Sequence, residues 1–372
     1  MNILVFSWRD PKHPLAGGAE QVMHEHMKGW ISAGHSVTLF SSRFAGGKRK
    51  EVLDGVHVIR RGIQYWGVQI LGALYYLFEK HEKYDLVVDQ FHGIPFFTPF
   101  YVRVPKLAVI QEVAREVWLR NDLPFPFDKI IGIIGYLGEP FIFWFYKRVP
   151  FMTGSNSAKE DLQKMGIQSN NITVVPHGVL LEDKPKKLPK KEKVNTVVHL
   201  GALAKDKGIE DSIETFGLLN EKGAFQFWII GRGGGPYLKM LKQKVKELGI
   251  EKNTVFWGFV SDKKKFELLA RAHVMINPSL LEGFGLVNIE ANAVGTPVVG
   301  YTSRGLVDSI KDGKSGFLVN PNTPHELAKT LRKVLCSKKG YNNLSRSSSK
   351  WSKEFSWTKS KAQSLDLIEK LG

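Results

Sequence analysis

The pattern of hydrophobic and polar positions alternates along the chain between two periods. Short apolar runs, such as ILVFSW at 3–8 and TVVHL at 196–200, are separated by longer segments with apolar residues at helical spacing. The short runs are typical of buried strands and the longer segments of amphipathic helices. Strands that alternate with helices form parallel sheets with helices on both faces. We therefore expect an α/β protein built from doubly wound sheets.

A lysine- and proline-rich segment at 181–194, LEDKPKKLPKKEKV, divides this pattern into two halves. Its few apolar residues predict an exposed linker. We expect one Rossmann-like domain at 1–180 and a second at 195–350, with a C-terminal helix at 351–372 that packs back toward the first domain. Ligands of open parallel sheets bind beyond the carboxyl ends of the strands. Two such domains facing each other would enclose a central cleft.

The composition of the chain excludes several kinds of site and partner. The single cysteine, Cys336, excludes an internal disulfide framework and a cysteine-built metal cluster. The net charge of +17 is concentrated in the second half of the chain and favours an anionic ligand or an acidic membrane surface. The basic residues are scattered, without an RNP-type motif or zinc-finger spacing, so nucleic acid is not an expected partner.

The most apolar stretch, residues 130–151, predicts a buried helix, with a membrane-surface element as the alternative. Glu139 and Pro140 interrupt it, so neither piece reaches the about 20 residues of a membrane span. Met1 leads directly into a predicted strand without the features of a signal peptide. We expect a cytoplasmic protein, with a peripheral position at the inner face of the membrane as an alternative.

The stretch EGFGLVNIEANA at 282–293 follows the predicted strand VMINPS and carries two glutamates. Gly283 and Gly285 allow close approach of the backbone to a ligand. A helix that begins between Gly285 and Val287 would direct free N–H groups at an anion. Eight helical positions would separate Glu282 from Glu290 by about 12 Å along the axis. Two contacts to different parts of one elongated ligand are therefore expected, rather than a pair that shares a proton.

The setting P-S-x-x-E-G-F-G-L-V-x-x-E-A-x-A-x-G-x-P-V-V at 278–299 resembles the retaining glycosyltransferases of family 4, which have the GT-B fold, and the resemblance extends over essentially the whole chain. It implies that the second domain binds a nucleotide sugar and the first binds the acceptor. It also implies that Glu282 lies by the donor sugar and Glu290 holds the ribose. The backbone by the sugar and diphosphate would be that of Phe284, Gly285, Leu286 and Val287.

Other segments of the second half fit the same donor. HLGALAKDKGIED at 199–211 places Gly201 at a strand end and Lys207 where the resemblance implies a diphosphate contact. Relatives commonly carry an arginine at the position of Ala202, and its absence weakens the expected diphosphate contact unless Lys205 or Arg232 replaces it. The segment VSDKKKFELLARA resembles the helix after the base-binding strand, which predicts a border of the base at Phe259 and Val260.

In the first half, Gly17 and Gly18 match the loop that approaches the donor phosphates and the acceptor. Gln111, followed by Glu112, stands where many relatives carry a histidine, and it cannot act as a general base. The remaining candidates for sugar or acceptor contacts are His92, at a strand end, and His177, at the entrance to the hinge. A structural role is the alternative for each histidine, and we expect Ser155 and Ser157 to act as helix caps.

No D-x-D motif or metal-ligand spacing occurs, so no fixed metal and no cofactor are expected. The resemblance implies retaining transfer of a hexose from a nucleotide sugar to a hydroxyl or phosphate acceptor such as a lipid-linked or surface-glycan precursor. It favours a UDP-hexose as the donor and leaves a GDP-sugar as the alternative. The alternatives are an isomerase similar to the UDP-sugar 2-epimerases and a non-catalytic protein that binds nucleotide sugars.

Overall fold

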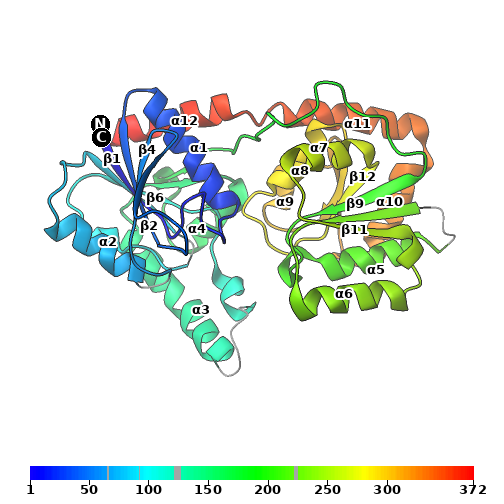
Figure 1. Cartoon of the computed structure of the whole chain (residues 1–372), viewed down its shortest axis with the longest axis horizontal. Helices are drawn as coiled ribbons and strands as arrows, with labels where there is room; N and C mark the ends of the chain where they lie inside the picture. Colours follow the sequence, from blue (N-terminus) through cyan, green and yellow to red (C-terminus); the bar gives the residue numbers. More distant parts are fainter. Residues whose placement is uncertain (65–66, 92, 121–126, 222–224) are drawn as a thin grey trace. The chain divides into compact units, whose positions relative to one another are not determined.

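A computed structural model describes residues 1–64, 67–91, 93–120, 127–221 and 225–372. The chain divides into two compact units, one of residues 1–178 and 357–372 and one of residues 179–356. Each unit has a largely parallel sheet at its centre with helices on both faces (Figure 1). The α/β class with doubly wound sheets is therefore confirmed.

The first unit contains an eight-stranded sheet of order β3-β4-β2-β1-β5-β6-β7-β8. All neighbours in it pair in parallel except β3 and β4, which form an antiparallel hairpin. The strands are β1 (Asn2–Phe6), β2 (Ser36–Ser41), β3 (Lys50–Leu53), β4 (Val56–Arg60), β5 (Leu86–Gln90), β6 (Lys106–Val109), β7 (Phe151–Thr153) and β8 (Ile172–Val174). The helices are α1 (Gly18–Ser32), α2 (Gly67–Phe78), α3 (Phe127–Tyr146), α4 (Asn156–Lys164) and α12 (Trp357–Leu371).

The C-terminal helix α12 belongs to the first unit and packs along α1. The hydroxyl of Ser364 is the centre of this contact, with His26 Nδ1 at 2.9 Å and the indole N–H of Trp30 at 3.1 Å. Lys361 adds an ion pair of 2.7 Å with the buried Glu25. Polar contacts between buried side chains therefore hold α12, near the C-terminus, against α1, near the N-terminus.

The second unit contains a six-stranded parallel sheet of order β11-β10-β9-β12-β13-β14. Its strands are β9 (Asn195–Leu200), β10 (Phe225–Ile230), β11 (Thr254–Gly258), β12 (Val274–Asn277), β13 (Val298–Tyr301) and β14 (Gly316–Val319). Its helices are α5 (Ile209–Leu219), α6 (Gly235–Glu247), α7 (Asp262–Arg271), α8 (Leu286–Ala293), α9 (Leu306–Ser309), α10 (Pro324–Cys336) and α11 (Lys338–Ser352).

The limits of the units differ from the expected ones near residue 351. Residues 351–356 belong to the second unit, because Phe355 packs edge-on against Phe284 with their ring centroids 5.3 Å apart, and Trp351 packs on Phe355. The expected linker at 181–194 is mostly exposed, but Lys191 is not free in solvent. Its ammonium donates to the carbonyl of Ala272 at 2.6 Å and to the hydroxyl of Thr296 at 2.8 Å, and burial lowers its pKa to about 7.

The apolar stretch 130–151 does not form a helix buried on all sides. Helix α3 runs through Pro140, and Glu139, Phe143 and Tyr146 face the core while most other apolar residues of the helix face solvent. The expectation of a buried helix is therefore wrong for the outer face. Apolar composition alone could not reveal this, because a helix that is apolar all round does not show which of its faces is covered.

Candidate functional site

The loops that follow β9 and β12 pack together at the carboxyl edge of the second sheet. Gly208 has a φ of +65°, and a Cβ there would lie 2.2 Å from the carbonyl oxygen of Pro278. The N–H of Leu280 and the hydroxyl of Ser279 both donate to the carbonyl of Asp206, at 3.1 and 3.2 Å. Only glycine fits the first position, so this close approach depends on Gly208.

This packing brings Lys207 and Glu282 together. Lys207 Nζ lies 3.0 Å from Glu282 Oε1 and 3.4 Å from the carbonyl oxygen of Leu281. Both side chains are partly exposed, at 28% and 19%. A cation and a carboxylate therefore lie side by side on a surface at the strand ends, where a ligand can reach both.

A buried polar network fixes the start of α8. Asn277, the last residue of β12, donates to Asn288 Oδ1 at 2.8 Å, and Asn288 donates to the hydroxyl of Ser309 at 2.8 Å. Gly285, which precedes the helix, has a φ of +82°, and a Cβ there would lie 2.8 Å from Asn288 Nδ2. The helix begins at Leu286, inside the range expected from the sequence, so its first N–H groups have a fixed direction.

Glu290 pairs with a residue that the sequence did not single out. Lys265 Nζ lies 2.7 Å from Glu290 Oε1 and 2.8 Å from Asp262 Oδ1. Burial raises the pKa of Glu290, and Lys265 opposes this effect. Burial lowers the pKa of Lys265, but Glu290 and Asp262 outweigh it and the net shift is upward. Lys265 is the last residue of a run of three lysines, and only the packing of α7 against α8 distinguishes it from the other two.

Glu282 and Glu290 therefore use different lysines rather than each other. Phe284, between them, turns its side chain into the apolar cluster with Phe355 and is 5% exposed. Leu286 and Val287 form the first turn of α8 and are partly buried. The arrangement presents backbone rather than the Phe284 ring at the start of the helix.

The neighbouring strand ends complete this edge of the sheet. Arg232, after β10, lies over the ring of Phe259, after β11, with its guanidinium carbon 4.9 Å from the ring centroid. The ring of Phe259 is 72% exposed, and Val260 beside it is partly buried. An exposed flat ring backed by a guanidinium is a surface on which an aromatic base can stack.

The loop from Gly201 to Lys205 lies next to Arg232. The N–H of Leu203 donates to the carbonyl of Arg232 at 2.9 Å, and a Cβ on Gly231 would lie 1.7 Å from the carbonyl oxygen of Gly201. Ala202 and Lys205 are both exposed. Arg232 is therefore closer in the fold to position 202 than its distance in the sequence indicates.

A separate cavity of about 240 Å³ lies in the first unit, at the carboxyl ends of β1, β5 and β6. Gly17 and Gly18 border it at the start of α1, where the N–H of Gly17 donates to Glu20 Oε2 at 2.7 Å. Its other lining residues are Ser7, Trp8, Arg9, Leu15, Ala19, Glu20, Gln90, Phe91, Gln111 and Glu112. Polar and charged groups around such a cavity suit a ligand with many hydroxyl groups.

Of the two candidate histidines, His177 and His92, the structure describes His177. His177 is buried behind Gln111 and does not line the cavity, and its Nε2 lies 2.7 Å from Gln111 Oε1. Burial lowers the pKa of His177 to about 4, so the ring is neutral at pH 7 and orients the amide of Gln111. His92 lies outside the described residues. Ser155 caps α4 by accepting from the N–H of Ala158 at 3.1 Å, whereas Ser157 lies inside the helix.

Among the residues that the structure describes, no group of three His, Cys, Asp or Glu side chains is placed to hold a metal ion. None of the helices in these described ranges combines the length and the hydrophobicity that a membrane span requires.

Two family models together match nearly all of the chain. The model described as Glycosyltransferase Family 4 matches residues 16–183, and that described as Glycosyl transferases group 1 matches residues 182–351. The chain belongs to glycosyltransferase family 4. An uncharacterised glycosyltransferase of Methanocaldococcus jannaschii is 25% identical over 358 residues, which cover 90% of this chain and 89% of that protein.

Solved structures agree with the GT-B fold of this glycosyltransferase. A sucrose-phosphate synthase of Thermosynechococcus elongatus has a TM-score of 0.78 and 17% identity, with 100% of this chain and 98% of that chain covered. Anabaena HepE, solved in complex with UDP and glucose, has a TM-score of 0.75 and 18% identity, with both chains covered completely. Members of the family use nucleotide-sugar donors.

Proposed function

We propose that this glycosyltransferase is a retaining, metal-independent hexosyltransferase, with a UDP-hexose as its favoured donor and a GDP-sugar as the second choice. Its acceptor is a hydroxyl or phosphate of a lipid-linked or surface-glycan precursor. The observation that carries the proposal is the pairing of Lys207 with Glu282 beside the start of α8. A cation, a carboxylate and free helix N–H groups at one strand edge suit a sugar diphosphate.

In this proposal the diphosphate lies between Lys207 and the N–H groups at the start of α8. The bond from the anomeric carbon to the diphosphate oxygen breaks, and negative charge develops on the leaving oxygens. Lys207 and the helix dipole stabilise that charge without a metal. Glu282 lies by the donor sugar and accepts hydrogen bonds from its hydroxyls.

Retention follows when the acceptor oxygen attacks the face of the sugar from which the diphosphate leaves. The new bond joins the acceptor oxygen to the anomeric carbon, and the acceptor proton passes to the departing phosphate oxygen. No protein nucleophile is needed, so the glutamine at position 111 is compatible with transfer. Its amide, held by His177, orients a hydroxyl of the donor sugar or acceptor.

The remaining donor contacts are proposed to lie along the same carboxyl edge of the second sheet. Glu290 accepts hydrogen bonds from the ribose hydroxyls, as a carboxylate does in dinucleotide sites. The ring of Phe259 and the backbone at Val260 border the base. Gly201 and Lys205 lie on the phosphate side, where Arg232 supplies the guanidinium that position 202 lacks.

The acceptor is proposed to use the cavity of the first unit, which Gly17, Gly18, Gln111 and Glu112 line. UDP is favoured over GDP on the resemblance and on the UDP and glucose bound to Anabaena HepE. We further propose a location in the cytoplasm at the inner face of the membrane, where lipid-linked acceptors are accessible. The positive charge of the chain supports that location.

The test is turnover of UDP-, GDP- and ADP-hexoses with and without candidate acceptors, in the presence and absence of a chelator. Transfer that requires an acceptor, retains the anomeric configuration and is insensitive to the chelator supports the proposal. An epimerised sugar without an acceptor would indicate an isomerase, and binding without turnover a non-catalytic protein. The donor is chosen first by thermal shift, since a ligand at 100 times its Kd stabilises by about 2.7 kcal/mol.

A further inference from the structure

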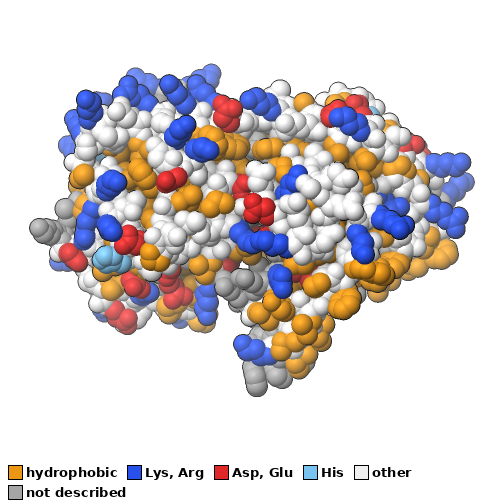
Figure 2. Space-filling view, turned by 180° about the vertical axis from the view of Figure 1, so that it is seen from behind, with side chains coloured by type: hydrophobic (Ala, Val, Ile, Leu, Met, Phe, Trp, Pro, Cys, Tyr) orange, Lys and Arg blue, Asp and Glu red, His pale blue; other side chains and the backbone are white. Residues whose placement is uncertain are grey.

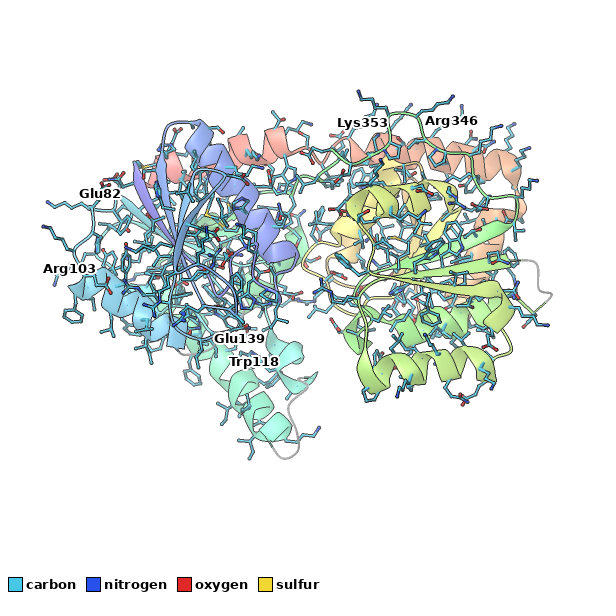
Figure 3. All side chains as sticks on the ribbon, viewed as in Figure 1. Glu82, Arg103, Trp118, Glu139, Arg346 and Lys353 are labelled. Atoms are coloured by element: carbon cyan, nitrogen blue, oxygen red, sulfur yellow. The ribbon has the colours of Figure 1, made fainter. Side chains whose placement is uncertain are left out.

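Helix α3 presents an apolar face to solvent. Eight of its large apolar side chains are 40–68% exposed, among them Ile134, Leu137, Phe141 and Trp144. Its one charged residue between 130 and 146, Glu139, faces inward and accepts from the N–H of Ala114 at 2.9 Å. Figure 3 shows it beside Trp118, where α3 meets the rest of the unit. The outer face is therefore free of charge over four turns, which is the reverse of an ordinary surface helix.

Helix α2 likewise turns an apolar face to solvent. Ile70, Leu71, Leu74, Leu77 and Phe78 are 37–76% exposed, and their spacing forms one continuous stripe on a helix. The core side of the helix contains smaller and more polar residues, including the buried Gln69 and Gly72. Two helices of the first unit thus turn their most hydrophobic faces away from the core.

The loop at 96–100 lies between the two helices and contacts both. Phe96 is buried and packs under α2, where its ring lies 3.1 Å from where a Cβ on the buried Gly72 would be. Phe100, which is 61% exposed, packs edge-on against Phe145 of α3 with ring centroids 4.7 Å apart. Both helices lie along the lower edge of the first unit in Figure 1, and Figure 2 shows hydrophobic side chains gathered over the projecting end of α3 with Lys and Arg at its margin. We call this area the α2–α3 surface.

Cationic side chains border the α2–α3 surface. A depression of about 660 Å³ beside Leu71 is lined by Arg43, Arg49, Lys50, Arg60 and Arg61. Arg60 and Arg61 pair with carboxylates, but within the described part of the chain no ion pair involves Arg43, Arg49 or Lys50. At the other side, Lys147 and Arg148 follow the end of α3 and are exposed. Cations therefore border the apolar area beside Leu71 and at the end of α3, where Lys147 Nζ lies 5.1 Å from the centroid of the Trp144 ring.

We propose that the α2–α3 surface binds an anionic phospholipid bilayer. The apolar faces of both helices enter the boundary between headgroups and acyl chains, and the depression beside Leu71 receives lipid phosphates. Amphipathic helices bind membranes through this combination of a buried apolar face and attraction to anionic lipids. The cationic border decides against a second protein copy as the occupant, because cations around an apolar patch repel those of an identical patch. This names the lipid-facing surface for the membrane location proposed above.

Vesicle flotation with the full chain tests the proposal. The probes are vesicles of phosphatidylcholine alone and of equimolar phosphatidylcholine and phosphatidylglycerol. We expect binding to the anionic vesicles at least about tenfold tighter than to the neutral ones, with part of the binding lost at high salt. Brominated phosphatidylcholine should quench the fluorescence of Trp144, and this quenching should be lost in Trp144→Phe.

Matched variants separate the two contributions. Leu74→Ser with Phe141→Ser should abolish binding, whereas Met240→Ser with Leu248→Ser, exposed apolar residues of the second unit, should leave it unchanged. Arg49→Glu with Lys50→Glu should remove the preference for anionic vesicles. The exposed pair Lys239→Glu with Lys246→Glu, on α6, makes the same change in net charge and should retain that preference. Because all these positions are exposed, melting temperatures verify that each variant folds.

Wild-type protein that ignores both kinds of vesicle overturns the proposal, as does a dimer in solution that covers this surface. Equal binding by the Leu74/Phe141 variant and the Met240/Leu248 control also overturns it. Flotation uses neither donor nor acceptor, so its result is independent of the proposed activity. Transfer to a soluble acceptor without vesicle binding refutes the membrane surface alone, and vesicle binding without any turnover refutes the proposed function alone.

Discussion

Lys265 of α7 and Glu290 of α8 form an ion pair of 2.7 Å in which both side chains are at most 17% exposed. Burial raises the pKa of Glu290, so its carboxylate depends on Lys265 to remain charged. Such a pair is costly to break, because removal of one partner leaves the other charge buried alone. A carboxylate held in this way keeps one direction, which suits recognition of two ribose hydroxyls.

Glu290→Ala is expected to weaken binding of the nucleoside diphosphate by about 1.5–3 kcal/mol, the scale of a hydrogen bond to a charged group. The measurement is calorimetric titration with UDP and GDP. Glu267→Ala, which removes a partly exposed glutamate from the same helix α7, is the control and should bind normally. Unchanged affinity in a folded Glu290→Ala protein would remove Glu290 from the ribose site.

A variant at Lys265 tests whether this lysine keeps Glu290 charged for nucleotide binding. Lys265→Met should raise the pKa of Glu290 further and weaken nucleotide binding at neutral pH, with recovery as the pH rises. Glu290→Gln does not depend on that ionisation, so its binding should not change with pH in the same range. If both variants respond to pH alike, Lys265 does not act through Glu290.

Glu282→Gln should lower turnover much more than it lowers nucleotide affinity, because we place Glu282 at the donor sugar. Lys207→Met should lower both, since Lys207 is placed at the diphosphate. The comparison is necessary because the two side chains pair at 3.0 Å, so each change also removes this ion pair from the other residue. Equal losses in turnover and in UDP binding for Glu282→Gln would contradict its placement.

Much of the fold could be predicted because buried parallel strands leave apolar runs in the sequence. The runs at 3–8 and 196–200 became β1 and β9, and the same reasoning located the strands at the centre of both sheets. Strand β3, KEVL, was missed because its apolar positions are few and it lies at the sheet edge, although the Asp54-Gly55 turn that follows is a hairpin signal.

The candidate site was predictable only where a motif links residues close in the sequence. Glu282, Gly285 and Glu290 lie in one such stretch. Lys265 was missed because its role depends on the contact between α7 and α8. The closeness of Arg232 to Ala202 could not be predicted either, because it arises from the loops after two adjacent strands, β9 and β10. The exposed face of α3 could not be predicted, since hydrophobicity shows how apolar a helix is and not which face is covered.

The pH dependence of the free energy of unfolding should reveal the raised pKa of Glu139. Burial raises its pKa to about 7, against hydrogen bonds from the N–H groups of Ala114 and Arg115 and from Trp118. The folded state therefore keeps the proton at a pH where the unfolded state has lost it. The free energy of unfolding should fall as the pH rises from about 4.5 to about 7, by at most about 1.4 kcal/mol per pH unit for this group.

Comparison with Glu139→Gln isolates this contribution. The difference in unfolding free energy between wild type and variant, from urea titrations, should decline across that range and stay level on either side. Glu160→Gln, a change at an exposed glutamate of α4, should show no such difference. A constant difference between wild type and Glu139→Gln from acid to neutral pH would show that the side chain titrates normally.

Ala202→Arg tests the departure from the family pattern. Position 202 is exposed, and its loop is hydrogen-bonded to Arg232 through Leu203. If the diphosphate lies between Lys207 and the start of α8, an arginine at 202 could add a charge-assisted, bidentate contact. UDP should then bind more tightly, and the gain should shrink in high salt because screening weakens charge pairs. Turnover need not rise, since tighter product binding can slow release.

Double variants identify which residue replaces the missing arginine. If Arg232 already contacts the diphosphate, the new guanidinium will be repelled, and UDP affinity will fall in Ala202→Arg and recover in Ala202→Arg with Arg232→Ala. Recovery only with Lys205→Ala would instead assign that role to Lys205. The hydrogen bond between Leu203 and Arg232 favours Arg232, because it holds the two loops together whereas Lys205 is simply exposed. Calorimetry at low and high salt distinguishes these outcomes, and affinity that ignores all three variants would show that this loop does not face the phosphates.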